Sequence, residues 1–312
     1  MESPVNFNTN QPITSLKSEQ VAPQSLLVGY WRRLVTNKLA VVSLIVLISM
    51  ILIALFGPLI YPQSPIKPDY AAINSQPSAK HWFGADNLGR DTLARLIFGL
   101  RVSLLVAAYV EALNIGLGVT FGLLAGYFGG IIDVVVTRLA DILFAFPGLL
   151  LAILVAATFG EVVTEQFGGI GRLLLVAGSL SLVSWPLMAR YVRGQTLVLR
   201  EQDFVTAARS LGAGDFHMIT RHILPNVVGL IIISSTLDVA SVVVNEAVLS
   251  LLGLGIQPPD PSIGKMINDS MPFLEASPLQ VFFPSAVLML IVLTVSFLGD
   301  GLRDAFDPQS LR

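Results

Sequence analysis

The sequence REQDFVTAARSLGAGDFHMITRHILPN, residues 200–226, separates two strongly apolar runs. Residues 173–188 before it are apolar apart from small and hydroxyl side chains, and residues 227–252 after it contain few polar positions. Apolar runs of about 20 residues are typical of helices that cross a bilayer, whereas the segment between them is polar and contains two glycines. The sequence therefore predicts a compact polar connection between two apolar helices.

Within this connection, apolar residues recur at helical spacing and predict a first helix over residues 201–211. Gly212 follows, as is usual just beyond the end of a helix, because glycine tolerates a positive φ. Asp215 is predicted to cap a second helix over residues 216–224, and Pro225 to limit that helix. The segment is thus expected to form two short helices joined by a turn.

Basic residues are concentrated in and beside this connection: Arg193, Arg200, Arg209 and Arg221. A compact, basic pair of helices between two membrane spans favours a docking element on the cytoplasmic side. An ordinary connecting loop is the alternative that these residues leave open.

The composition is that of a membrane protein. The chain has 312 residues, of which 54% are hydrophobic and 13% charged, and its mean hydropathy is +0.73. It contains no cysteine, which excludes disulfides, thiol nucleophiles and cysteine-based metal sites. The net charge of −2 gives no basic surface that would favour nucleic acid as a partner.

Apolar runs predict an all-α membrane protein with six transmembrane helices. We expect an N-terminal tail at residues 1–38, an external loop with an interfacial helix at 61–101, a core of five membrane helices at 102–299, and a C-terminal tail at 300–312. The six predicted membrane helices cover residues 39–60, 102–124, 139–159, 173–191, 227–252 and 281–298.

Local signals refine this arrangement. Asp91 is predicted to cap the interfacial helix, which would lie along the membrane surface, while Asp86 is expected to be a solvated charge. Pro147 is predicted to kink the third span near its start. In the second span, small residues recur at intervals of four, which predicts close packing against another helix: Gly118, Gly122 and Gly126.

The distribution of positive charge predicts the orientation. Twelve of the 19 Lys and Arg residues lie in the two tails, in the short turn after the second span, or in and beside the segment 200–226. The two short loops on the opposite side contribute only Arg172 and Lys265, and long loops count less in the positive-inside rule. Both termini and the segment 200–226 are therefore predicted to be cytoplasmic.

No motif indicates chemistry by this chain. The nearest match to a phosphate-binding loop, PSIGKM at residues 261–266, lacks the upstream glycine and the hydroxyl residue. The histidines, His81, His217 and His222, do not form an HExxH motif, and no GxSxG motif is present. We expect no catalytic residue and no metal site.

Five polar residues fall inside predicted spans: Glu111, Asn114, Asp238, Asn245 and Glu246. A charged side chain in hydrocarbon costs at least about 2.5 kcal/mol, so these groups should face a cavity or a partner. One interpretation is that they line a polar passage. The alternative is hydrogen bonding between helices or exposure at the membrane interface, particularly for Glu246 near the outer loop.

The sequences TAARSLGAG and RHILPN resemble the EAA loop of permease subunits in binding-protein-dependent ABC importers. The matching positions are Ala207, Ala208, Gly212, Ile223, Leu224 and Pro225. Thr206 departs from the pattern, because the family usually has Glu at this position. The resemblance implies that residues 200–226, here called the coupling segment, carry a coupling helix that contacts the ATPase through Thr206, Ala207, Ala208, Ser210, Leu211, Gly212 and Asp215.

Two further stretches, HWFGADNLGRDTLARLIFGLRVSLL at 81–105 and EAVLSLLGLGIQPPDPSIG at 246–264, resemble the C-type permease subunit of dipeptide, oligopeptide and nickel importers. This resemblance implies the type I ABC importer permease fold, with the coupling helix between the fourth and fifth spans, in a bacterial cytoplasmic membrane. The implied partners are membrane lipid, a homologous permease subunit in a heterodimer, an external solute-binding protein and two ATP-binding subunits. ATP and Mg would lie on those subunits, and this chain would bind no cofactor.

Other functions remain open from the sequence. The same machinery could carry nickel, an oligosaccharide or another small solute instead of peptides. A proton-coupled secondary transporter that uses Glu111 and Asp238 as relays is an alternative of another class, although such folds often show inverted repeats and no convincing repeat is present. A third possibility, a membrane-embedded enzyme, would need a cluster of nucleophile, base or metal-ligand residues, and the sequence shows none.

Overall fold

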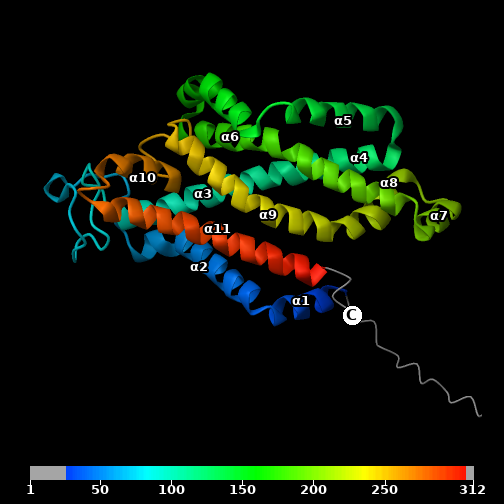
Figure 1. The fold of residues 1–312 in the computed structure, drawn as a ribbon, viewed down its shortest axis with the longest axis horizontal. Helices are drawn as coiled ribbons and strands as arrows, with labels where there is room; N and C mark the ends of the chain where they lie inside the picture. Colours follow the sequence, from blue (N-terminus) through cyan, green and yellow to red (C-terminus); the bar gives the residue numbers. More distant parts are fainter. Residues whose placement is uncertain (1–25, 307–312) are drawn as a thin grey trace, which may run out of the picture.

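The structure, a computed structural model, describes residues 26–306, and its regular elements there are helices apart from one bridge between Ala85 and Asp91 (Figure 1). Along the chain the elements are α1 (Leu26–Thr36), α2 (Lys38–Ile60), η1 (Tyr70–Ala72), α3 (Thr92–Asn114), η2 (Ile115–Val119), α4 (Thr120–Phe128), α5 (Gly130–Phe144), α6 (Gly148–Arg200), α7 (Asp203–Ser210), α8 (Asp215–His217), η3 (Met218–Ile223), α9 (Leu224–Leu251), α10 (Ile263–Ser270), η4 (Met271–Phe273) and α11 (Pro278–Phe306). The elements η2 and η3 are π-helical turns within longer helical runs.

Five continuous helical runs in the described part are long and apolar enough to cross a membrane: 38–60, 92–128, 148–200, 215–251 and 278–306. The run 148–200 is two helices, because Gly168 has a non-helical conformation with φ of 62°. The guanidinium of Arg172 covers Gly160, although these residues would lie about 18 Å apart along one straight helix. The two halves of α6 therefore fold back on each other at Gly168.

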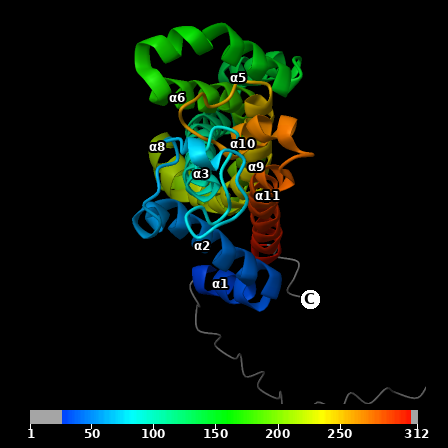
Figure 2. The same ribbon diagram turned by 90° about the vertical axis from the view of Figure 1, so that its left-hand side faces the viewer.

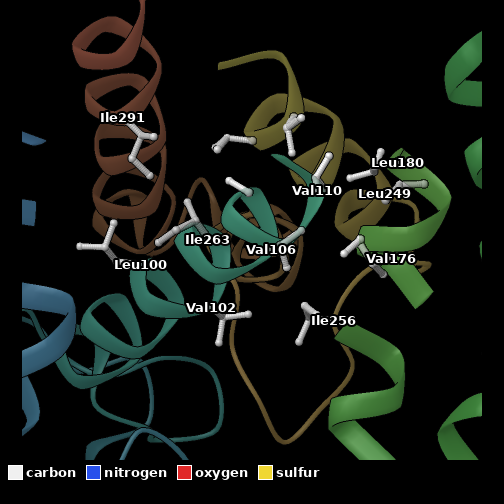
Figure 3. Packing of buried hydrophobic residues seen from close by; sticks show 14 of the residues in the cluster. Leu100, Val102, Val106, Val110, Val176, Leu180, Leu249, Ile256, Ile263 and Ile291 are labelled. Carbon is white, nitrogen blue, oxygen red and sulfur yellow. The ribbon is translucent and has the colours of Figure 1, made fainter. Parts of the chain in front are cut away.

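Helix α3 is the central element. It packs against α2, α6, α9, α10 and α11, and Figure 2 shows these helices around it. Figure 3 shows its inward-facing residues Val102, Val106 and Val110 among Val176 and Leu180 of α6, Leu249 of α9 and Ile291 of α11. Because α3 is covered by several helices, its polar residues Ser103, Glu111 and Asn114 are buried against protein.

The predicted interfacial helix is wrong, since residues 92–100 are the first turns of α3 itself. Asp91 caps the helix as predicted, and its Oδ1 accepts a hydrogen bond from the Ala94 amide at 2.8 Å. Leu96 and Leu100 are buried in the main core, and Arg95 is also buried. The segment joins α3 because its apolar side packs against protein.

A buried ionic network joins the loop at residues 61–91 to α10. Asp86 accepts a hydrogen bond from Arg90 Nε at 2.7 Å and lies 3.4 Å from Arg95 Nε, so its prediction as a solvated charge is wrong. Both arginines also approach Asp269, which pairs with Lys265 at 2.8 Å. These opposite charges compensate one another where water is excluded.

The third predicted span, 139–159, is divided rather than kinked. Helix α5 ends at Phe144, and Pro147 precedes the first residue of α6. Proline disfavours the helical conformation of the residue before it, which accounts for a complete break. Residues 160–172, which lie between the third and fourth predicted spans, are helical on both sides of Gly168.

The ends of the chain also differ from expectation. Part of the predicted N-terminal tail forms α1, in which Leu34 packs against Ala305 of α11. The remaining parts of the predicted tails, 1–25 and 307–312, lie outside the described residues. Between the fifth and sixth predicted spans, the chain forms α10, whose first turn is capped by Ser262.

The glycine stripe packs against the second half of α6, as the spacing predicts. A Cβ built on Gly118 would lie 2.6 Å from Met188, one on Gly122 would lie 2.7 Å from the Ala189 carbonyl oxygen, and one on Gly126 would lie 2.7 Å from Thr196. Three glycines thus let the backbones of α4 and α6 approach more closely than any side chain would allow.

We predict that Gly122→Ala destabilises the protein by about 1–3 kcal/mol, because overpacking of a close contact costs this much. The matched control is Gly116→Ala in the same helical run, where an added Cβ meets no atom within 4 Å. Thermal unfolding in detergent, followed by tryptophan fluorescence, should show a lower Tm for the first variant only. Equal Tm values would contradict the close packing of this stripe.

Candidate coupling and translocation sites

The coupling segment forms a hairpin between α6 and the long run that begins with α8 (Figure 1). Helix α7 covers residues 203–210, slightly less than the predicted 201–211. As predicted, Gly212 lies just beyond its end and has a positive φ of 87°. Val205 is its buried anchor. The turn after α7 is thus fixed by a glycine conformation that other residues rarely adopt.

The predicted second helix 216–224 is wrong in its start and its end. Gly214, not Asp215, occupies the N-cap position, and Asp215 is the first residue of α8. Pro225 does not end the helix, since it lies in the first turn of α9, directly after the π turn η3. The wider π turn accommodates a proline that lacks an N–H and crowds the preceding turn.

The hairpin rests on an apolar platform and exposes apolar side chains on its other side. Val205, Met218 and Ile223 are fully buried against residues of α4, α6 and α9. In contrast, Leu211 is 90% exposed and Phe216 is 80% exposed. Large apolar groups held outward on a packed support form a surface suited to a protein partner.

The predicted coupling residues lie together on this hairpin. Ala208 is partly buried and packs against the platform, and the others are exposed: Thr206, Ala207, Ser210, Leu211, Gly212 and Asp215. The Thr206 hydroxyl lies 3.5 Å from the carbonyl oxygen of Gln202 within its own helix. The residue that replaces the family's Glu thus makes a local contact.

Tyr127, at the end of α4, is a residue that the sequence patterns missed. Its hydroxyl donates to Asp215 Oδ1 at 2.7 Å and accepts from Arg209 Nη2 at 3.3 Å. Its carbonyl oxygen accepts from Arg200 at 3.1 Å. Contact with Tyr127 raises the pKa of the Arg209 guanidinium. No periodic signal joins α4 to a hairpin 88 residues away, so only the tertiary structure reveals this link.

An ion pair between α5 and α6 adds a further link in this region. Arg193 of α6 forms an ion pair with Asp133 of α5, with Nη2 donating to Oδ2 at 2.7 Å. Helices α4, α5 and α6 are thus tied together next to the coupling hairpin.

In the middle of the helix bundle, Asn114 of α3 is the centre of a polar cluster. Its amide nitrogen donates to Asp238 Oδ2 of α9 at 2.9 Å. Its amide oxygen accepts from the hydroxyl groups of Ser181 at 3.0 Å and Ser184 at 2.9 Å, both in α6. These serines were not expected, and they show that Asn114 connects three helices. Glu111, one turn earlier on α3, is also buried beside this cluster.

Glu246 belongs to a different cluster. It is fully buried and accepts hydrogen bonds from Ser103 of α3 at 3.1 Å and from Ser250 at 2.8 Å. Ser250 in turn lies 3.2 Å from Ser262 in the loop before α10. Asn245 is partly buried. The five polar residues predicted to line a passage therefore do not form one surface, and the structure brings together Glu111, Asn114 and Asp238.

A cavity of about 440 Å³ opens beside Asp238. Its walls are formed by α6, α9 and Arg303 of α11, and they are mainly apolar. The lining residues nearest Asp238 in sequence are Leu237 and Ser241. Mainly apolar walls with a few polar groups are typical of sites that bind small molecules.

The loop at residues 61–91 contains a further group of polar residues. His81 lies 2.8 Å from Asp91, whose Oδ2 also accepts a hydrogen bond from the Tyr61 hydroxyl at 2.8 Å. Burial and the Asp91 hydrogen bond raise the pKa of Tyr61 to about 12. A hydrogen bond from Lys80 lowers the pKa of Asp69. These contacts fix the loop to the start of α3.

Comparisons with known proteins agree with this architecture. Residues 118–312 match the family model of the binding-protein-dependent transport system inner membrane component. Residues 25–77 match the model of the N-terminal TM domain of oligopeptide transport permease C. The two matches cover most of the chain, including the coupling hairpin.

Individual relatives cover nearly the whole chain. The dipeptide transport system permease protein DppC of Alkalihalophilus pseudofirmus is 40% identical over 279 residues, which are 89% of this chain and 88% of that protein. The glutathione transport system permease protein GsiD of Pectobacterium atrosepticum is 38% identical over 281 residues, which are 90% of each chain.

Among solved structures, an inward-facing conformation of the MetNI methionine ABC transporter matches with a TM-score of 0.52 and 18% identity. The match covers 68% of this chain and 97% of that chain, and it supports the fold alone. The chain therefore has the all-α type I ABC importer permease fold, and it belongs to the family of binding-protein-dependent ABC transport permeases, in the dipeptide and oligopeptide branch.

Proposed function

We propose that this chain is the C-type permease subunit of an ATP-driven importer and moves di- or oligopeptides across the bacterial cytoplasmic membrane. The observation that carries the proposal is the coupling hairpin, which holds Leu211 and Phe216 outward on a buried platform. Relatives at about 40% identity are named as dipeptide and glutathione permeases, which supports a peptide as the cargo.

The chain contributes passage and coupling but no catalysis. The assembly would include two ATP-binding subunits that carry ATP and Mg, one of which would bind the hairpin. A homologous permease subunit would complete the passage, and an external solute-binding protein would deliver the cargo. We place six spans in the membrane, the third formed by α5 with the first half of α6 and the fourth by the second half of α6, with both termini cytoplasmic. This orientation follows the positive charge near the coupling segment.

Transmission would run through two helical paths. Closure of the ATPases around ATP would displace α7 and α8, and this motion reaches α4 through the Tyr127–Asp215 hydrogen bond. From there α4, η2 and α3 lead to Asn114, while η3 and α9 lead to Asp238. The spans would then open outward, and hydrolysis would return them to the inward-facing state.

Uptake by the reconstituted assembly tests the function. Proteoliposomes that contain the complex, supplied with its binding protein, should accumulate labelled alanylalanine only when ATP is present on the side of the ATP-binding subunits. Uptake of nickel or an oligosaccharide in place of the peptide would assign the other cargo. Transport by the purified chain alone under a pH gradient would instead establish the proton-coupled alternative.

We predict that Leu211→Asp lowers ATP-dependent uptake at least about tenfold, because it removes an apolar contact and places a charge in the interface, a loss of roughly 1.4 kcal/mol or more. Leu211 contributes little to the packing of its own chain, so the variant should fold normally. Pull-down of the ATPase subunits and uptake are the measurements. Leu211→Met is the matched control and should behave like the wild type, and normal uptake by Leu211→Asp would contradict the docking role.

We predict that Tyr127→Phe lowers the number of peptides transported for each ATP hydrolysed, while ATPase binding persists. The substitution removes the hydroxyl that joins α4 to Asp215 and Arg209, and each such hydrogen bond contributes about 1 kcal/mol. Parallel assays of uptake and ATP hydrolysis measure the ratio. Tyr109→Phe, at an exposed position of α3, is the control, and an unchanged ratio for both variants would assign Tyr127 to packing.

A further inference from the structure

Two carboxyl groups lie next to each other at the polar cluster. Glu111 of α3 is only 7% exposed, and its electrostatic neighbours are Asp238, Ser235 and Asn114. Neither of its carboxyl oxygens makes a hydrogen bond of acceptable geometry, and the buried hydroxyl of Ser235 is likewise without one. The cluster thus contains three buried oxygen atoms whose hydrogen-bonding capacity is unused.

The charge of the pair is not balanced by a nearby cation. In the described part of the chain, the groups that act on Glu111 and Asp238 are each other, Asn114 and Ser235, none of which carries a positive charge. Asn114 supplies one hydrogen bond to Asp238, and its amide oxygen is already used by two serines. Adjacent carboxyl groups in a medium of low dielectric constant favour a positive charge between them.

The carboxyl oxygens of Glu111 are buried, and the pair meets the cavity through Asp238. Asp238 lines it directly, together with the hydroxyl residues Ser234 and Ser241. Of the residues that line the cavity, Arg303 alone is basic, and it is exposed on α11. The cavity therefore offers an acidic, hydroxyl-rich region on α9 in otherwise mainly apolar walls.

We propose that Glu111 and Asp238 form a binding site for a primary ammonium group, and that this group is the N-terminal amine of the transported peptide. An ammonium group has three N–H donors and no acceptor, which suits two carboxyl groups and neighbouring hydroxyls. The inference rests on the proposed function, since it identifies the part of the cargo that the permease itself contacts. Asn114 orients Asp238 and is a positioning residue.

Carbodiimide labelling tests the site in the intact importer complex in nanodiscs. Dicyclohexylcarbodiimide modifies carboxyl groups within membranes, and peptide mapping by mass spectrometry measures the rate at Glu111 and Asp238. Alanylalanine at ten times its Kd should slow labelling of the pair roughly tenfold, because about nine-tenths of the sites are then occupied. Methylammonium should also protect, whereas N-acetyl-alanylalanine should not, because acetylation removes the charge.

The same molecule supplies a control, because the rate at the exposed Glu161 of α6 should not change with any compound. Glu111→Gln should remove the protection at Asp238. Equal labelling with and without alanylalanine would overturn the proposal, as would a pair that does not react without ligand. Protection by methylammonium alone would exclude the peptide amine, and labelling that responds to pH but to no ammonium compound would assign the pair to protons. ATP-dependent uptake by the unmodified complex is measured separately, so failure of this site and failure of the proposed function can be distinguished.

Discussion

The hydrogen bond between Asn114 and Asp238 is the contact on which the arrangement of the membrane helices depends. A polar group in lipid has no water to bind, so it must find its partner on another helix. Asn114 uses its amide nitrogen for α9 and its amide oxygen for two serines of α6. One side chain thereby fixes the relative position of the central helix and two neighbours. The apolar core around α3 adds packing, but its contacts are not directional.

A second fixed contact lies beside the hairpin, at the other end of the same helical runs. Tyr127 and Asp215 join the end of α4 to the start of α8, close to the apolar platform beneath the hairpin. Between the two contacts, the glycine stripe holds α4 against α6 at a distance that excludes intervening side chains. The hairpin is therefore joined to the distant spans by packed backbone and by directed hydrogen bonds, as the proposed coupling role requires.

Local composition and spacing were sufficient for the all-α membrane class, most of the apolar helices, the cap at Asp91, the glycine stripe and the first helix of the hairpin, whereas the type I permease fold followed from the family resemblance. The sequence was insufficient where tertiary contacts determine the position of a helix or the partner of a side chain. The sequence predicts an interfacial helix at residues 92–100, but these residues belong to α3 and are largely buried. The sequence predicts that Asp215 caps a helix, but its side chain accepts a hydrogen bond from Tyr127 instead. Glu246 and Asp238 look alike on one helix, and only their neighbours on α3 and in the loop before α10 place them in separate clusters.

The two π turns have a geometric consequence. One of them, η2, separates Asn114 from Tyr127 along one helical run, and the other, η3, separates Asp215 from Asp238 along another. Each residue of an α-helix advances the direction of its side chains by about 100°, so one residue more or less in a turn redirects everything beyond it. If either turn returned to regular α geometry, a helix joined correctly at one end would present the wrong side at the other. The register of these two turns thus sets the alignment of both polar contacts at once.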